Sequence, residues 1–175
     1  AKIKRFLRRI ITASKHFIKQ KIFAIKRRVL RYLVFPLQGR KYDRYIKHEI
    51  VVQKRAFLWT QNFGWNVELF QRPQHIAACL SRQNNSVFYF VNRQSDPDVL
   101  FAKKISPNLF LINRNNKAFI EKLKSFVDSN YKHRYLHQYS TNSEISLKTL
   151  KEYENNGYHI LYEYIDDLAP EISCT

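Results

Sequence analysis

Beyond residue 50 the chain alternates short apolar runs with amphipathic stretches, and this alternation restricts the possible folds more than any other feature. The runs of strand length occupy residues 56–59, 86–91, 108–112, 135–139 and 158–165. The stretches with helical periodicity lie between them, at residues 73–83, 117–129 and 143–156. This order predicts βαβ units with right-handed crossovers. We therefore expect an α/β fold over residues 51–175, with a Rossmann-like parallel sheet flanked by helices.

The loop after the first predicted strand is the first place to search for a site, because doubly wound sheets bind ligands outside the carboxyl ends of their strands. In this loop Asn62 offers a donor and an acceptor, Gly64 permits a left-handed turn, and Trp65 offers a flat face for a sugar ring. Arg72 and His75 lie in the first turn of the next helix, whose free amides and dipole favour an anionic or hydroxyl-rich ligand. Composition leaves a second interpretation equally open, in which the aromatic rings pack on the core and Arg72 is solvated.

Two carboxylates follow the last predicted strand, at the same edge of the sheet. Asp166 can accept a hydrogen bond from a substrate hydroxyl, or orient Arg72 or His75 across the crevice. Asp167 is better suited to cap a helix over residues 168–172. Only Asp166 is therefore kept as a candidate site residue.

Two stretches resemble a known family. The run WNVELFQRPQHIAACLS at residues 65–81, followed by SVFYFV at 86–91, resembles the opening of family-4-type glycosyltransferases of the GT-B fold. The run GYHILYEYIDDLAPEIS at residues 157–173 is similar to a late strand of the same domain and its acidic turn. The resemblance covers residues 55–175.

The resemblance implies a two-domain enzyme of which this chain is the first half. In GT-B enzymes the N-terminal domain mainly binds the acceptor, and the C-terminal domain binds the nucleotide-sugar donor through a pair of glutamates. The chain ends before such a domain, so we expect the acceptor side of a sugar transfer and no activity from the isolated chain. The acceptor would be a glycan or a lipid-linked glycan. No cofactor and no metal are expected, since the nucleotide sugar is a co-substrate held by the other domain.

Positive charge is concentrated in the first third of the chain. Of the 31 Lys and Arg residues, 18 lie within residues 1–55, which contain only two acidic residues. Apolar residues recur there at steps of three and four, which predicts one long basic amphipathic helix over residues 2–34, or two helices with a break near residues 12–14. Pro36, Gly39 and the charged stretch to Lys47 are interpreted as its end and a linker, so residues 1–50 form a separate segment.

This basic segment has several possible partners. An anionic membrane surface fits its apolar stripe and basic flanks, which would place the protein in the cytoplasm or on the inner face of the cell membrane. In a second interpretation the segment packs against an upstream domain. In a third it packs on its own domain and its charges are solvated. Nucleic acid ranks last, because the aromatic and basic interleaving of RNA-binding modules is missing. The alternative function is accordingly a non-catalytic module, bound to membrane or nucleic acid, with a structural α/β domain.

The remaining candidate motifs are interpreted as structural. Asp96-Pro97-Asp98 spells the D-x-D of metal-dependent glycosyltransferases, but Pro97 favours a turn and that motif belongs to another transferase fold. The histidines other than His75, which are His16, His48, His133, His137 and His159, lack metal-ligand spacing and are interpreted as surface or core residues. Cys79 is expected on the inward face of its helix, and two cysteines form neither a disulfide framework nor a zinc pattern. No window has the apolar length that crosses a bilayer.

Overall fold

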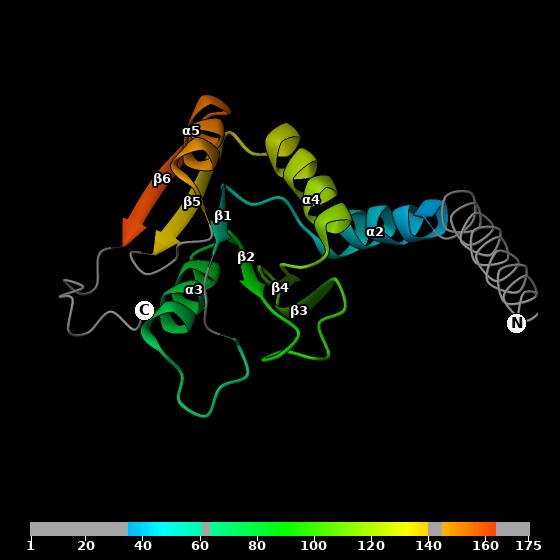
Figure 1. Cartoon of the computed structure of the whole chain (residues 1–175), viewed down its shortest axis with the longest axis horizontal. Helices are drawn as coiled ribbons and strands as arrows, with labels where there is room; N and C mark the ends of the chain where they lie inside the picture. Colours follow the sequence, from blue (N-terminus) through cyan, green and yellow to red (C-terminus); the bar gives the residue numbers. More distant parts are fainter. Residues whose placement is uncertain (1–34, 61–63, 140–144, 164–175) are drawn as a thin grey trace, which may run out of the picture. The chain divides into compact units, whose positions relative to one another are not determined.

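The computed structural model describes residues 35–60, 64–139 and 145–163 (Figure 1). The chain divides into two compact units, Ala1–Tyr42 and Asp43–Thr175. The predicted helix over residues 2–34 lies outside the described residues. The predicted linker is wrong, because helix α2 (Phe35–Glu49) continues through it.

The second unit is built on one twisted sheet. Its strands in the described residues are β1 (Arg55–Trp59), β2 (Ser86–Val91), β3 (Ala102–Ser106), β4 (Leu109–Asn113), β5 (His133–Tyr139) and β6 (Tyr158–Glu163). The strand order is β3-β4-β2-β1-β5-β6, and all neighbours are parallel except the β3–β4 hairpin. Figure 1 shows β5 and β6 side by side and pointing the same way. The predicted α/β, Rossmann-like parallel sheet is confirmed.

The central strands form because they are apolar along their whole length. Every residue of β2 and β4 is buried, as expected for strands covered on both faces. Strand β3 was not predicted, because its sequence AKKIS has no apolar run and its middle residues are exposed. Its lysines suit an exposed sheet edge, where charged side chains discourage pairing with other chains.

Among the described residues, the helices that cover the sheet are α3 (Arg72–Arg82), α4 (Lys117–Asn130) and α5 (Leu147–Asn155). Ala77 of α3 packs in one core cluster with Phe57 of β1 and Tyr89 of β2. On the opposite face, Ile120 of α4 and Tyr153 of α5 line the same pocket as Phe90 of β2. Among the described residues, no helix combines the length and the apolarity needed to span a bilayer.

One prediction about α3 is wrong. Cys79 is exposed instead of packing in the core. The buried positions of the helix are Pro73, Gln74, Ala77 and Ser81, so two polar side chains take part in its inward face. Gln74 is fully buried because its side chain has hydrogen-bond partners, which removes the cost of burying an amide.

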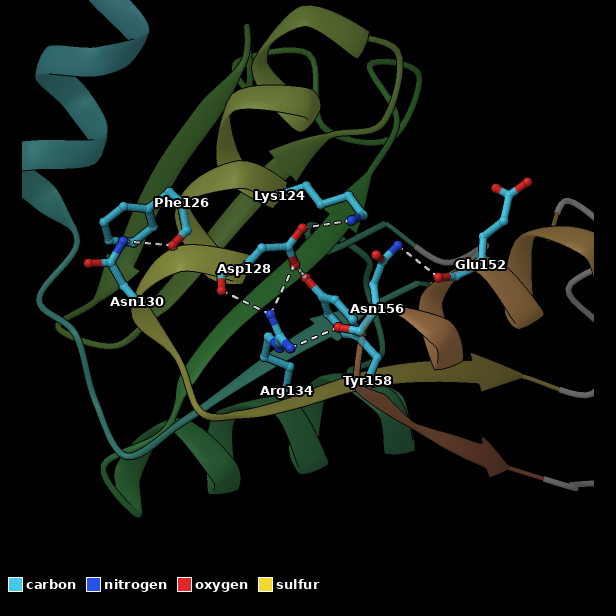
Figure 2. A network of polar contacts seen from close by, with 8 residues as sticks. All are labelled: Lys124, Phe126, Asp128, Asn130, Arg134, Glu152, Asn156 and Tyr158. Atoms are coloured by element: carbon cyan, nitrogen blue, oxygen red, sulfur yellow. Dashed lines mark hydrogen bonds and ion pairs between the residues drawn. The ribbon is translucent and has the colours of Figure 1, made fainter.

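A polar network holds β5 and β6 to α4 at the amino ends of these strands. Figure 2 shows Asp128 of α4 between Lys124, Arg134 and Tyr158. The Tyr158 hydroxyl donates to Asp128 Oδ1 at 2.6 Å, and Lys124 Nζ donates to Oδ2 at 2.7 Å. Burial, followed by this bond to Asp128, raises the pKa of Tyr158 above its ordinary value, so the hydroxyl keeps its proton. Arg134 Nη2 closes the network by donating to the Asn156 carbonyl at 2.8 Å.

Gly157→Ala should destabilise the domain at this network. Gly157 has φ +78°, a left-handed conformation that costs a residue with a side chain about 1–2 kcal/mol. A Cβ there would also lie 2.7 Å from Arg134 Nη2, so the guanidinium would have to move. We expect the urea midpoint of unfolding to fall. An unchanged midpoint would mean that the turn relaxes at no cost.

Candidate functional site

The candidate site lies at the carboxyl edge of the sheet, between β1 and β5. These strands are neighbours, but the chain reaches β2 and β4 on one side before it returns to β5 on the other. The strand order therefore reverses between them, and ligands of open α/β sheets bind outside the carboxyl ends of the strands at such a point. Both the loop after β1 and the first turn of α3 lie at this edge.

A buried carboxylate forms hydrogen bonds to the backbone of the loop that precedes α3. Asp96 is fully buried and accepts hydrogen bonds from the backbone amides of Trp65, at 2.9 Å, and Asn66, at 3.0 Å. The Ser95 hydroxyl donates to the same carboxylate at 2.8 Å. Asp98, the other acidic residue of the D-x-D sequence, is exposed and pairs with Lys103. The two carboxylates serve different contacts, and no group in the described residues could hold a metal ion.

Gly64 allows the loop before α3 to lie close to Ser95 and Asp96. The left-handed turn predicted for Gly64 depends on a φ angle that involves Phe63, which lies outside the described residues. A Cβ on Gly64 would lie 2.3 Å from Ser95 Cβ, which leaves no room for a side chain. The Gly64 carbonyl accepts from Gln74 Nε2 at 2.9 Å, and Gln74 Oε1 accepts from the Gln71 amide at 2.8 Å. One buried glutamine thus ties the loop to the start of α3.

Three side chains from distant parts of the sequence meet at the sheet edge. Glu163, the last residue of β6, pairs with Arg72 Nε at 3.0 Å and with His137 Nε2 at 2.8 Å. The side chains of Glu163 and His137 are 12% and 3% exposed, whereas that of Arg72 is 64% exposed. The mostly buried Glu163 carboxylate therefore forms an ion pair, without a hydrogen bond at Oε1 in the described residues, with one end of a guanidinium whose remainder faces solvent. Such a guanidinium can bind a hydroxyl, carboxylate or phosphate oxygen.

The His137 ring is enclosed by its neighbours. It stacks on the Trp59 ring with centroids 3.8 Å apart and an interplanar angle of 7°. Burial lowers the pKa of His137 below its usual 6.5, although the hydrogen bond and charge of Glu163 and a bond to the Thr60 backbone oppose this shift. The lowered pKa favours the neutral imidazole at neutral pH, and its single N–H donates either to the Glu163 carboxylate or to the Thr60 backbone, depending on the tautomer.

The lowered pKa of His137 predicts a pH dependence of stability. Below pH 6.5 the unfolded chain takes up a proton at this residue, whereas the folded protein does so only at lower pH. The free energy of unfolding is therefore unaffected by His137 titration above pH 6.5, and it decreases as the pH falls below 6.5. Urea denaturation between pH 5 and pH 8, both values chosen to bracket the usual histidine pKa of about 6.5, measures it.

A matched pair of variants isolates this effect. His137→Gln should flatten the dependence on pH, because the titrating group is gone. His159→Gln, at an exposed position four residues before Glu163 in β6, removes an imidazole for which no contact with Glu163 is found in the described residues, and it should leave the dependence in place. An unchanged dependence in His137→Gln would assign it to other groups.

The other predicted site residues fall in different places. Trp65 is partly buried against the core cluster and meets Tyr89 edge-on at 5.2 Å, as in the second interpretation of the loop. His75 is exposed and lies edge-on to Phe70 at 5.2 Å. Asn62 and Asp166 lie outside the described residues. Among the predicted site residues that the structure describes, Arg72 contacts the buried cluster.

Sequence reasoning missed Glu163, which pairs with Arg72, and His137, which pairs with Glu163. Glu163 lies within the strand motif that carries the family resemblance, three residues before Asp166. Its position at the carboxyl end of β6 was the available signal. His137 was assigned no special role, because nothing in its neighbourhood along the chain marks it.

Comparison with known proteins adds no family. No family model matches the chain, and neither a curated protein nor a solved structure matches it. The fold, the arrangement around Arg72 and the sequence motifs are therefore the basis for assigning a function.

Proposed function

We propose that residues 51–175 form the acceptor-side half of a glycosyltransferase that moves a sugar from a nucleotide-sugar donor to a glycan or lipid-linked acceptor. The observation that carries the proposal is the exposed Arg72 guanidinium held by the buried Glu163 at the carboxyl edge of the sheet. Arg72 belongs to the QRPQH motif on which the family resemblance rests. The Rossmann-like sheet is the fold that the resemblance requires.

In this proposal Arg72 binds the acceptor, and Glu163 and His137 position it. A guanidinium fixed through Nε keeps its terminal N–H groups for acceptor oxygens. Fixing the guanidinium before the acceptor arrives reduces the side-chain entropy lost on binding. The donor is bound by a second domain outside these residues, so the acceptor-side half has no cofactor of its own. The basic segment of residues 1–34 would hold the enzyme against an anionic membrane, where lipid-linked acceptors are found.

The test uses the full-length product of the gene that encodes this chain. It is incubated with UDP- and GDP-linked hexoses carrying a radiolabelled sugar, together with membranes from the same organism as the acceptor source. We expect transfer of label to a glycan or glycolipid. Arg72→Ala should reduce the rate at least tenfold, because a hydrogen bond to a charged group is lost.

Arg82→Ala is the matched control, since Arg82 lies in the last turn of the same helix. It should leave the transfer rate near that of the unaltered enzyme. Full activity of Arg72→Ala, with unchanged acceptor affinity, would contradict the proposal. Absence of transfer with every donor, together with salt-sensitive binding of anionic vesicles or RNA by residues 1–55, would favour the non-catalytic module instead.

A further inference from the structure

A second feature of the carboxyl edge lies on the α4 and α5 face of the sheet and has no part in the proposed acceptor site. It is a pocket of about 240 Å³ at the ends of β1, β2 and β4. Thr60, directly after β1, and Phe90 of β2 lie on the sheet side of the pocket. Arg114 and Lys117 come from the turn between β4 and α4 and from the first residue of that helix.

The lining of this pocket is positively charged. Arg114 and Lys117 both contribute to it, and its described lining contains no carboxylate. In the part of the chain that the structure describes, no salt bridge is formed by Lys117, although six other lysines and arginines have acidic partners. A positive lining in a concave site raises the local concentration of anions.

The backbone adds donors at the same place. Helix α4 has 14 residues, and the Asn116 side chain caps the amide of Phe119. In the part of the chain that the structure describes, the amides of Lys117 and Ala118, one residue and two residues after Asn116, have no acceptor, and the positive end of the helix dipole also acts there. The turn is fixed before any ligand arrives, because the Arg114 amide donates to the Val91 carbonyl at 2.9 Å and the Asn115 amide to Asn113 Oδ1 at 2.9 Å.

We propose that this pocket binds the phosphate group of an organic phosphate, with Arg114 and Lys117 on its oxygens. A phosphate monoester offers three oxygens and about two negative charges, which match a guanidinium, an ammonium and two amides. Phe90 and Ile120 line the apolar part of the pocket and would contact the organic group. The inference concerns a different face from Arg72 and holds whether or not the protein transfers sugars.

The test is an NMR titration of the ¹⁵N-labelled 175-residue chain. Glucose 6-phosphate is added, with glucose and inorganic phosphate as separate probes. We expect saturable shifts of the Lys117 and Ala118 amides with glucose 6-phosphate, weaker binding of inorganic phosphate and none of glucose. Lys117→Ala and Arg114→Gln should each weaken the binding about tenfold, as expected for the loss of one charge-assisted hydrogen bond.

Lys148→Ala is the matched control. Lys148 is an exposed lysine in the first turn of α5, at another helix start and outside the pocket lining. It should leave the affinity unchanged, and the dispersion of each variant's spectrum reports its folding. If Lys148→Ala weakens binding as much as Lys117→Ala does, the attraction is one of general charge and the proposal is overturned. Absence of shifts at Lys117 and Ala118 with all soluble probes and with vesicles overturns it as well.

A second arm separates a lipid headgroup from a soluble phosphate. Phosphatidylcholine vesicles with and without phosphatidic acid are sedimented with the same variants, all of which keep the basic residues 1–34. Binding to phosphatidic acid that falls about tenfold in Lys117→Ala and Arg114→Gln supports a lipid source of the phosphate. If these changes leave vesicle binding intact and glucose 6-phosphate binds, the phosphate comes from a soluble ligand. If they leave vesicle binding intact and glucose 6-phosphate does not bind, the proposal is contradicted.

Discussion

Asp96→Ala should lower the free energy of unfolding by about 3 kcal/mol, since hydrogen bonds to a charged group contribute about 1.5–3 kcal/mol each and buried donors left unpaired cost about as much. The carboxylate is fully buried and accepts from the amides of Trp65 and Asn66 and from the Ser95 hydroxyl. Alanine leaves these donors without their acceptor. Urea denaturation measures the loss, and hydrogen exchange of the two amides should accelerate beyond the change in global stability.

Asp98→Ala is the control for this prediction. Asp98 belongs to the same D-x-D sequence, but its carboxylate is exposed, and a hydrogen bond from Lys103 lowers its pKa. Exposed ion pairs contribute little to stability, so the unfolding midpoint should hardly move. Equal losses for the two variants would mean that Asp96 contributes no more than a solvated charge.

Phe119→Ala should cost about 4 kcal/mol of unfolding free energy, within the range of about 3–5 kcal/mol for buried phenylalanine. Phe119, in the first turns of α4, is fully buried. Its ring lies 5.1 Å from that of Phe101 and 6.0 Å from that of Tyr45 on α2. Removing the ring would leave a cavity among these side chains, and thermal or urea denaturation reports its cost.

Two further variants calibrate this loss. Phe119→Leu keeps much of the apolar volume and should cost clearly less than alanine. Leu147→Ala removes a side chain that is 78% exposed and should be nearly neutral. A loss in Phe119→Ala no larger than in Leu147→Ala would show that the space around Phe119 collapses without cost.

Most elements of the domain could be predicted because their signals are local. The run SVFYFV can satisfy its apolar side chains only as a buried strand, and the observed β2 has the predicted bounds. Lys117 opens α4 as predicted, after an asparagine that caps the helix. Strand β3 escaped prediction because its stability comes from backbone bonds to β4 and not from burial of its own side chains.

The rotation of α3 was harder to predict. Hydrophobicity placed Cys79 inward, yet Gln74 and Ser81 take inward positions instead. A buried glutamine is stable only when its amide finds partners, and these are the Gly64 carbonyl and the Gln71 amide in the loop. The sequence of the helix does not predict those partners, because they are backbone groups of the loop before it and their positions depend on the folded path of that loop.

In the candidate site, too, some features could be predicted from the sequence and others could not. The sequence alone determined that Arg72 starts a helix at the carboxyl edge of a parallel sheet, because strand length, helical period and the position of Pro73 are properties of short segments. It also suggested that Asp166 orients this arginine, but Asp166 lies outside the described residues, and the carboxylate that pairs with Arg72 in the structure is Glu163, which the sequence analysis did not name.

The tertiary structure decided which side chains meet there. The parallel register pairs Trp59 with His137 and Tyr139 with Glu163, and this register places the ring stack and the carboxylate on one face of the sheet. A shift of one residue would turn each of these side chains to the opposite face. Register is set by packing across the whole sheet, so the partners of Arg72 follow from the folded structure and not from any stretch of sequence around them.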